Sequence, residues 1–159
     1  MNFSLPVEGQ ITSGFGWRKY PGTGSDEFHN GIDIAVPEGS PVKAAASGIV
    51  LKKYYSDSGG NQMVLRHANG YQTGYAHLRS FRKEPGDQVK KGETIALSGS
   101  TGHVTGPHLH FTVTNKKDEK IDPVRALTSM DWVQWTIGGG IILLIVLIIL
   151  FVRKFKITK

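Results

Sequence analysis

Short alternating segments separated by clusters of glycine constrain the fold of this chain more than any other feature. The 159 residues include 20 glycines and seven prolines, many of them in clusters such as residues 20–25 and 56–61. Between the clusters, apolar and polar residues alternate, which is typical of strands with one buried face, and no long helical period occurs before residue 124. We expect strands in the ranges 41–45, 48–55, 63–67, 72–77, 94–98 and 108–115.

These segments predict a mainly β domain, built as an antiparallel sheet or as an open sandwich of two packed sheets. A domain of about 125 residues is large enough to bury its own core. The chain contains no cysteine, so no disulfide supports the fold, and the redox compartment cannot be read from cysteine usage.

The expected strand at 108–115 begins with two histidines at alternate positions, His108 and His110. Successive strand side chains point to opposite faces, so both imidazoles share one face while Leu109 and Phe111 share the other. Taken alone, this pair suits half of a metal site and a polar surface equally well.

A partner for this pair lies upstream, where His29 and Asp33 stand four residues apart. Gly31, Pro37 and the β-branched residues between them favour an extended segment over a helix, and the even spacing still puts both side chains on one side. With His110 they form a set of two imidazoles and one carboxylate, which suits zinc and leaves a fourth position for water.

Three further histidines are ambiguous in the sequence. An isolated histidine is more often a partly buried residue with one satisfied ring nitrogen than a functional group. We interpret His67 and His103 as structural or surface residues, whereas His77 depends on the motif around it.

Four separated motifs are informative together: 13–18 (SGFGWR), His29-x-x-x-Asp33, 75–78 (YAHL) and 100–111 (STGHVTGPHLHF). In this order they resemble the signatures of the lysostaphin-type, or LytM-type, zinc metalloendopeptidases, and the resemblance extends from about residue 12 to residue 124. It implies a peptidoglycan hydrolase with a β fold of the duplicated hybrid motif type.

By this resemblance, His29, Asp33 and His110 are the expected zinc ligands, and His77 and His108 are the expected catalytic residues. The catalytic pair would transfer protons and stabilise the transition state, with the division of roles between the two left open. The expected substrate bond is an amide in a peptidoglycan stem or cross-bridge.

Two departures from the family pattern lead to further expectations. Thr112 occupies a position where relatives often carry glutamate, which predicts looser ligand orientation without loss of metal binding. No N-terminal pro-segment is recognisable, so we expect a domain that is active as made.

The C-terminal sequence predicts a membrane span. The 21 residues between Asp131 and Arg153 carry no charge and include an unbroken apolar run at 141–152. At about 1.5 Å per residue, such a helix crosses a bilayer core of roughly 30 Å, and Trp132 and Trp135 suit its interface. We therefore expect a metallopeptidase domain at residues 1–128, a transmembrane helix at 129–152 and a basic tail at 153–159.

The basic tail also accounts for most of the net charge of +6, because it holds four of the 19 Lys and Arg residues. The rest of the chain is nearly balanced, so we expect no specific nucleic-acid recognition, although the tail can contact phosphates or lipid headgroups. The expected partners are peptidoglycan and a lipid bilayer.

The expected localisation is that of a single-pass membrane protein. The positive-inside rule puts the tail in the cytoplasm and the enzyme outside, yet residues 1–6 show no signal-peptide pattern. Either the span itself carries the domain across the bacterial cytoplasmic membrane, or the domain is made in the cytoplasm and joins the internal membrane of a bacteriophage virion, where it would act on the wall at entry.

Two other function classes fit parts of the sequence. A catalytically silent LytM-like activator or scaffold of other wall hydrolases would share the fold, but such domains typically lack metal ligands that are all present here. A carrier domain is suggested by the hairpin pattern at 86–95, yet no lysine lies in a recognisable attachment tripeptide.

Overall fold

The computed structural model of the protein describes residues 3–19 and 23–128. Within these residues the chain forms antiparallel strands and one short helix, α1 (Pro123–Thr128). The strands are β1 (Gln10–Ser13), β2 (Gly16–Lys19), β3 (Asp26–His29), β4 (Ile32–Ala35), β5 (Pro41–Lys43), β6 (Gly48–Ser56), β7 (Gly60–Arg66), β8 (Gln72–Phe81), β9 (Gln88–Val89), β10 (Thr94–Ser98), β11 (His108–Thr114) and β12 (Lys120–Ile121).

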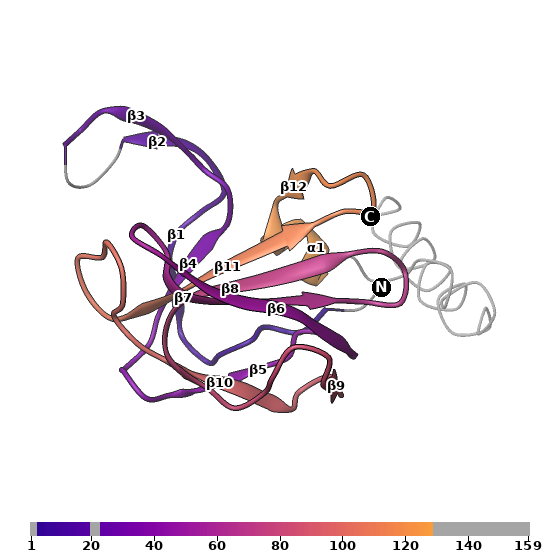
Figure 1. Ribbon diagram of the computed structural model, residues 1–159. Coiled ribbons are helices and arrows are strands. Elements are labelled where there is room, and N and C mark those ends of the chain that lie inside the picture. The colour runs from indigo at the N-terminus through magenta and orange to yellow at the C-terminus, as the bar shows by residue number, and fades with distance from the viewer. Residues whose placement is uncertain (1–2, 20–22, 129–159) are drawn as a thin grey trace, which may run out of the picture. The chain divides into compact units, whose positions relative to one another are not determined.

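Ten of these strands form one antiparallel sheet, and β2 and β3 form a separate hairpin that projects from it (Figure 1). The main path through the sheet is β1-β4-β11-β8-β7-β6-β9, with β10 paired to both β5 and β8 and with β12 paired to β11. The prediction of a mainly β, antiparallel fold is confirmed.

All the expected strand ranges contain a strand, with differences at their ends. The largest are in β7, which begins at residue 60 rather than 63, and in β8, which continues to residue 81. The sequence did not predict β1, β2, β3, β9 and β12 as separate strands, nor α1. These elements are only two to six residues long, too short to show a hydrophobic period.

Strands β4 and β11 orient the polar face of the sheet. Ile34 and Leu109 lie opposite each other and are fully buried, whereas the next pair in the register is Asp33 with His110. Because side chains alternate along each strand, Asp33, His108 and His110 lie together on the face away from this part of the core. The hydrophobic alternation therefore determines where the polar cluster forms.

The expected transmembrane helix at 129–152 and the basic tail at 153–159 lie outside the described residues. Among residues 3–19 and 23–128, no helix is long and apolar enough to cross a membrane.

Candidate metal centre

Three side chains from three strands converge at one point on the polar face. His29 ends β3, Asp33 lies in β4 and His110 in β11. His29 Nε2 is 3.1 Å from Asp33 Oδ1 and 3.0 Å from His110 Nδ1, and His110 Nδ1 is 2.8 Å from Asp33 Oδ1. The spacing allows one ion to reach all three atoms at the about 2.0–2.2 Å bond lengths of zinc.

The turn between β3 and β4 brings these residues together. A Cβ atom on Gly31 would lie 2.5 Å from the carbonyl oxygen of Phe111 and 2.9 Å from His110 Nε2. Only glycine therefore lets the backbone pass this close to the His110 ring.

Hydrogen bonds at the far side of each ring fix the tautomers of the two histidines. His29 Nδ1 donates to the Gly14 carbonyl at 2.7 Å, and His110 Nε2 donates to Asn30 Oδ1 at 3.1 Å. In a neutral imidazole the other nitrogen then carries a lone pair. Both lone pairs face the Asp33 carboxylate, so three acceptor atoms meet with no donor between them, an arrangement that a cation stabilises.

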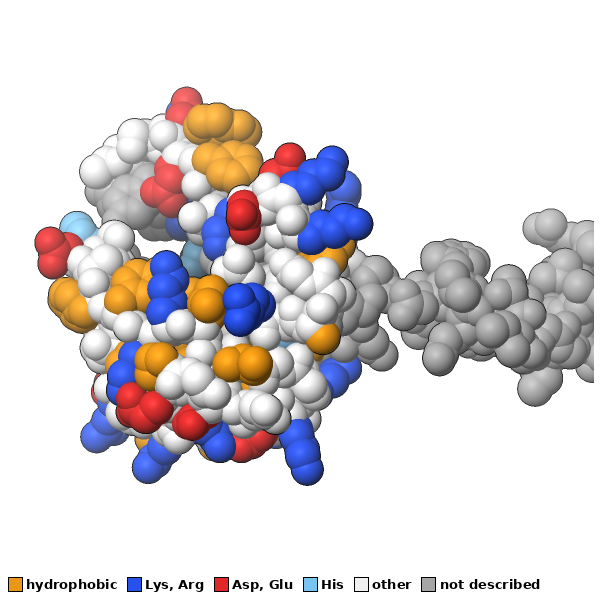
Figure 2. Space-filling model, turned by 45° about the vertical axis from the view of Figure 1, so that its right-hand side comes forward, with side chains coloured by type: hydrophobic (Ala, Val, Ile, Leu, Met, Phe, Trp, Pro, Cys, Tyr) orange, Lys and Arg blue, Asp and Glu red, His pale blue; other side chains and the backbone are white. Residues whose placement is uncertain are grey.

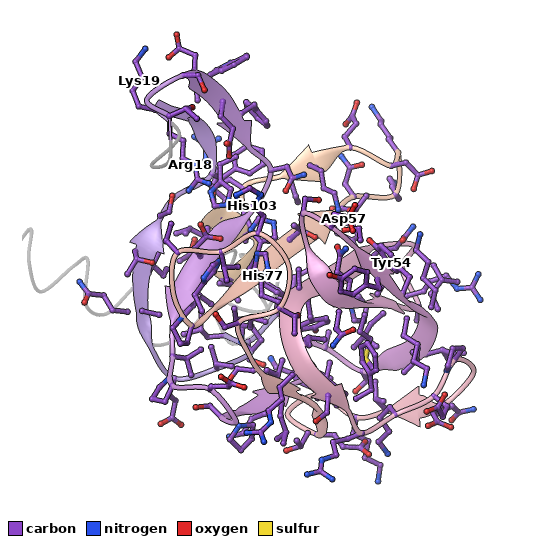
Figure 3. The ribbon with its side chains drawn as sticks, turned by 60° about the vertical axis from the view of Figure 1, so that its left-hand side comes forward. Arg18, Lys19, Tyr54, Asp57, His77 and His103 are labelled. Atoms are coloured by element: carbon purple, nitrogen blue, oxygen red, sulfur yellow. The ribbon has the colours of Figure 1, made fainter. Side chains whose placement is uncertain are left out.

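The second oxygen of Asp33 is held by Arg18 on β2. Arg18 Nη1 lies 3.1 Å from Asp33 Oδ2 and also donates to Ser13 Oγ, while Nη2 lies 3.0 Å from Glu27 Oε1. Sequence reasoning gave Arg18 no role, although its place in the motif at 13–18 was an available signal. Figure 3 shows Arg18 at the base of the hairpin, above the sheet that carries His77.

The electrostatics of the three residues match the protonation states that metal ligands need. Burial raises the pKa of Asp33, but the nearby His110 and His29 outweigh it and hold that pKa well below its usual range. Burial lowers the pKa of His110, against the opposing effect of Asp33. The set is therefore an ionised carboxylate with a neutral His110 at neutral pH.

A β-bulge in β8 turns His77 toward this cluster. Between the pairs Asn61 with Leu78 and Met63 with Tyr75, β7 has one residue and β8 has two, Ala76 and His77. His77 has a φ of 60°, and its N–H donates to the Gly59 carbonyl at 2.8 Å. Bulges of this kind re-aim a side chain, and here the one that strand alternation would send to the core faces the groove instead.

His77 and His108 form a second pair beside the three ligand candidates. Their ring centroids are 4.6 Å apart, and His108 Nε2 is 3.8 Å from Asp33 Oδ1. His77 Nδ1 donates to the Thr101 carbonyl and His108 Nδ1 to the Gly106 carbonyl, each at 2.8 Å. Each ring thus keeps its Nε2 lone pair for a ligand or a proton, and burial lowers the pKa of His77 to about 4.

Thr112, where relatives often carry glutamate, follows His110 on the same face of β11. Its hydroxyl accepts a hydrogen bond from Lys120. The candidate ligands are held instead by hydrogen bonds to the Gly14 carbonyl, Asn30 and Arg18. His67 is buried away from the site, and His103 lies exposed on the loop before β11, at the edge of the groove (Figure 3).

An aromatic rim borders the groove on the hairpin side. Phe28 lines the groove, and its ring lies 5.2 Å from Phe15 and 5.6 Å from Trp17. Trp17 is 77% exposed and Phe28 45%, and Figure 2 shows hydrophobic side chains gathered at this end of the molecule.

Comparison with known proteins agrees with this geometry. The model of the family described as peptidase family M23 matches residues 27–123. The DD-carboxypeptidase/endopeptidase Mpg of Neisseria meningitidis is 46% identical over 110 residues, which is 69% of this chain and 25% of that protein. The peptidoglycan DD-endopeptidase ShyB of Vibrio cholerae is 43% identical over 118 residues, 74% of this chain and 28% of that protein. The chain thus spans about a quarter of the length of these relatives.

Solved structures show the same fold. A zinc-containing peptidase from Vibrio cholerae superposes with a TM-score of 0.73 at 40% identity, over 82% of this chain and 40% of that one. The catalytic domain of lysostaphin from Staphylococcus simulans gives a TM-score of 0.68 at 35% identity, over 76% of this chain and 93% of that one.

Proposed function

The chain belongs to peptidase family M23, a family of zinc metallopeptidases, and on that basis we propose that it hydrolyses amide bonds in the peptide stems or cross-bridges of peptidoglycan. The supporting observation is the meeting of three acceptor atoms, from His29, Asp33 and His110, with no donor between them. We propose that these three residues hold the zinc ion.

Zinc bound at this site supplies an activated water and polarises the carbonyl of the scissile bond. The chain's own contribution is a pair of imidazoles with free Nε2 atoms, on His77 and His108. Either Nε2 can accept a proton from the attacking water, and the resulting imidazolium can donate to the oxyanion or to the leaving amine. Arg18 keeps the Asp33 carboxylate oriented while the proton is accepted and then donated.

The proposed substrate rests on the names of the relatives, two of which are a DD-carboxypeptidase/endopeptidase and a peptidoglycan DD-endopeptidase. Support from this chain is an open groove that passes over the metal candidates and includes Phe28 and Tyr54 in its walls. A groove of this kind suits an extended peptide.

Digestion of purified peptidoglycan followed by mass spectrometry of the released muropeptides tests the proposal. We expect the wild-type chain to release peptide-cleaved products, and His110→Ala to release none while failing to retain zinc. His103→Ala is the matched control, because that exposed histidine also lines the groove but is not one of the metal candidates. Unchanged release by His110→Ala would contradict the zinc assignment, and a wild-type chain that releases nothing would favour a silent activator.

We further propose that residues 129–152 anchor the enzyme in a membrane, because the 21 residues between Asp131 and Arg153 carry no charge and begin with two tryptophans suited to the interface, Trp132 and Trp135. The enzyme then works close to a bilayer, in the bacterial envelope or as part of a phage virion at entry. Protease accessibility in intact spheroplasts and in inverted vesicles separates the two topologies. If the enzyme domain is protected from protease in inverted vesicles, it does not stay on the cytoplasmic side of the membrane, which would contradict the virion alternative.

A further inference from the structure

One cation in the groove, Lys120, pairs with no carboxylate among the described residues. Lys120 lines the same groove as the metal candidates, and its Nζ donates to the Thr112 hydroxyl at 3.1 Å. In the described part of the chain, no carboxylate lies within ion-pair distance of Lys120. The other cations at the groove wall differ, since Arg18 pairs with Asp33 and Lys19 pairs with Asp26.

A second lysine increases the positive potential at this end of the groove. Lys52 lies close enough to act on Lys120, whose pKa is lowered by burial and then by the charge of Lys52. The Lys52 Nζ also sits 4.8 Å above the ring of Tyr54, which lines the groove. Two like charges this close to each other repel, and a bound anion relieves that repulsion.

The strand geometry places Lys120 at a defined distance from the metal candidates. His110 and Thr112 are successive residues on one face of β11, about 7 Å apart along the strand. Lys120 reaches Thr112 from β12, where it pairs with Thr114. An anion at Lys120 therefore lies about two residues of extended peptide away from the bond at the metal.

The floor of the groove is open between these two points. Gly74 on β8 lies opposite Thr112, and a Cβ atom on Gly74 would approach Thr112 Oγ1 to 2.6 Å. A glycine at this position keeps the path from the metal candidates to Lys120 free of a side chain. A peptide lying along the groove can thus reach both.

We propose that Lys120, assisted by Lys52, binds a free carboxylate of the peptide substrate and so selects acidic peptides for cleavage. The inference rests on the proposed peptidase function and adds a substrate preference to it. The carboxylate is either the end of the peptide chain or the side chain of an acidic residue, because both present the same acceptor atoms to an ammonium group.

Kinetics on matched synthetic peptides test this subsite. Three peptides of one sequence are compared. One has both carboxylates free, one is amidated only at the chain end, and one is amidated only at the acidic side chain. With the full wild-type chain we expect kcat/KM to fall about tenfold when the recognised carboxylate is amidated, mainly through KM, and the affected peptide identifies the source.

Lys120→Met should lower kcat/KM for the free peptide to the amidated value and leave the amidated peptide unchanged. Lys120→Arg should keep most of the preference, and Lys117→Met, at an exposed lysine in the turn before β12, should keep all of it. Thermal melting and zinc content confirm that each variant is folded and loaded.

Two results would overturn the inference while leaving the peptidase function intact. One is a wild-type chain that cleaves free and amidated peptides equally well, and the other is a Lys120→Met variant that loses activity equally on both. A wild-type chain that cleaves neither these peptides nor peptidoglycan would instead overturn the proposed function, and this inference with it.

Discussion

Histidines serve in two polar clusters of this domain, and the two clusters differ in what their ring nitrogens contact. At the groove, His29, His77, His108 and His110 each donate one ring N–H to an oxygen of the chain and keep the other nitrogen without a protein donor. In the core, both ring nitrogens of His67 are satisfied by the protein. The unsatisfied nitrogen, more than burial, thus distinguishes the four candidate site histidines from His67.

The core cluster is a chain of hydrogen bonds with a single direction. His67 Nδ1 donates to the Ser47 carbonyl at 2.9 Å, so its Nε2 accepts from the Thr73 hydroxyl at 2.9 Å. Thr73 in turn accepts from the Tyr75 hydroxyl, which accepts from the Ala45 N–H, each at 2.9 Å. Every donor and acceptor in this chain of hydrogen bonds is paired only while His67 is neutral. The cluster is therefore a structural unit with no group left to bind a ligand.

The largest difference between the clusters should appear when a free nitrogen is removed. We expect His77→Ala and His108→Ala each to lower kcat by about 10²–10⁴-fold, the usual contribution of general acid–base groups, while zinc content stays unchanged. Metal analysis and single-turnover kinetics check this. Loss of zinc in either variant would assign that histidine to the ligands and break the division into two pairs.

A smaller effect is expected at the residue that orients a ligand. Arg18→Met removes the hydrogen bond to Asp33 Oδ2 and should weaken zinc affinity by about 10–100-fold, measured by competition with a chelator. Lys19→Met, at an exposed neighbour that pairs only with Asp26 among described residues, is the control. Equal zinc affinity in wild type and Arg18→Met would show that the groove residues hold the metal without this support.

Much of this arrangement could be predicted from the sequence, because alternation and motif spacing are local. The alternation around Leu109 correctly placed His108 and His110 on one face. His29 and Asp33 do lie together, but the turn at Gly31 between β3 and β4 brings them there, not an even spacing along one extended segment. The assignment of His67 to a structural role agrees with its burial and its two hydrogen bonds.

The rest depends on contacts between distant segments, which a local pattern does not contain. The bulge that turns His77 to the groove arises from the pairing of β7 with β8, and the sequence range 72–77 read as a regular strand. Lys120 reaches the groove only because β12 pairs with the end of β11. Arg18 acquires its role from the hairpin of β2 and β3, whose short strands show no hydrophobic period.

Within the core cluster, removing one hydroxyl should cost stability without touching activity. Tyr75→Phe leaves the Ala45 N–H without an acceptor, and we expect a loss of about 1–3 kcal/mol in the free energy of unfolding. Urea denaturation measures the loss, and Tyr55→Phe at a 61% exposed position is the control. The kcat of folded Tyr75→Phe should match wild type, and a reduced kcat would mean that the core cluster supports the site directly.

The smallest expected effect is the pH dependence that the core cluster contributes to stability. Burial lowers the pKa of His67 below its ordinary value of 6.5, although the Ser47 carbonyl opposes the shift. The unfolded chain therefore binds more protons than the folded one as the pH falls below about 6.5, so the contribution of His67 is fully present above that pH and is lost below it. The slope from one such group is at most about 1.4 kcal/mol per pH unit. A protonated His67 would have to donate to Thr73 Oγ1, so the Thr73 O–H would lose its acceptor. Urea denaturation of the zinc-loaded wild type and His67→Gln between pH 7.5 and 5.5 measures the difference, since the two chains differ only at residue 67. We expect the wild type to lose more stability than the variant over this range, and equal slopes would show that His67 is not held neutral by its partners.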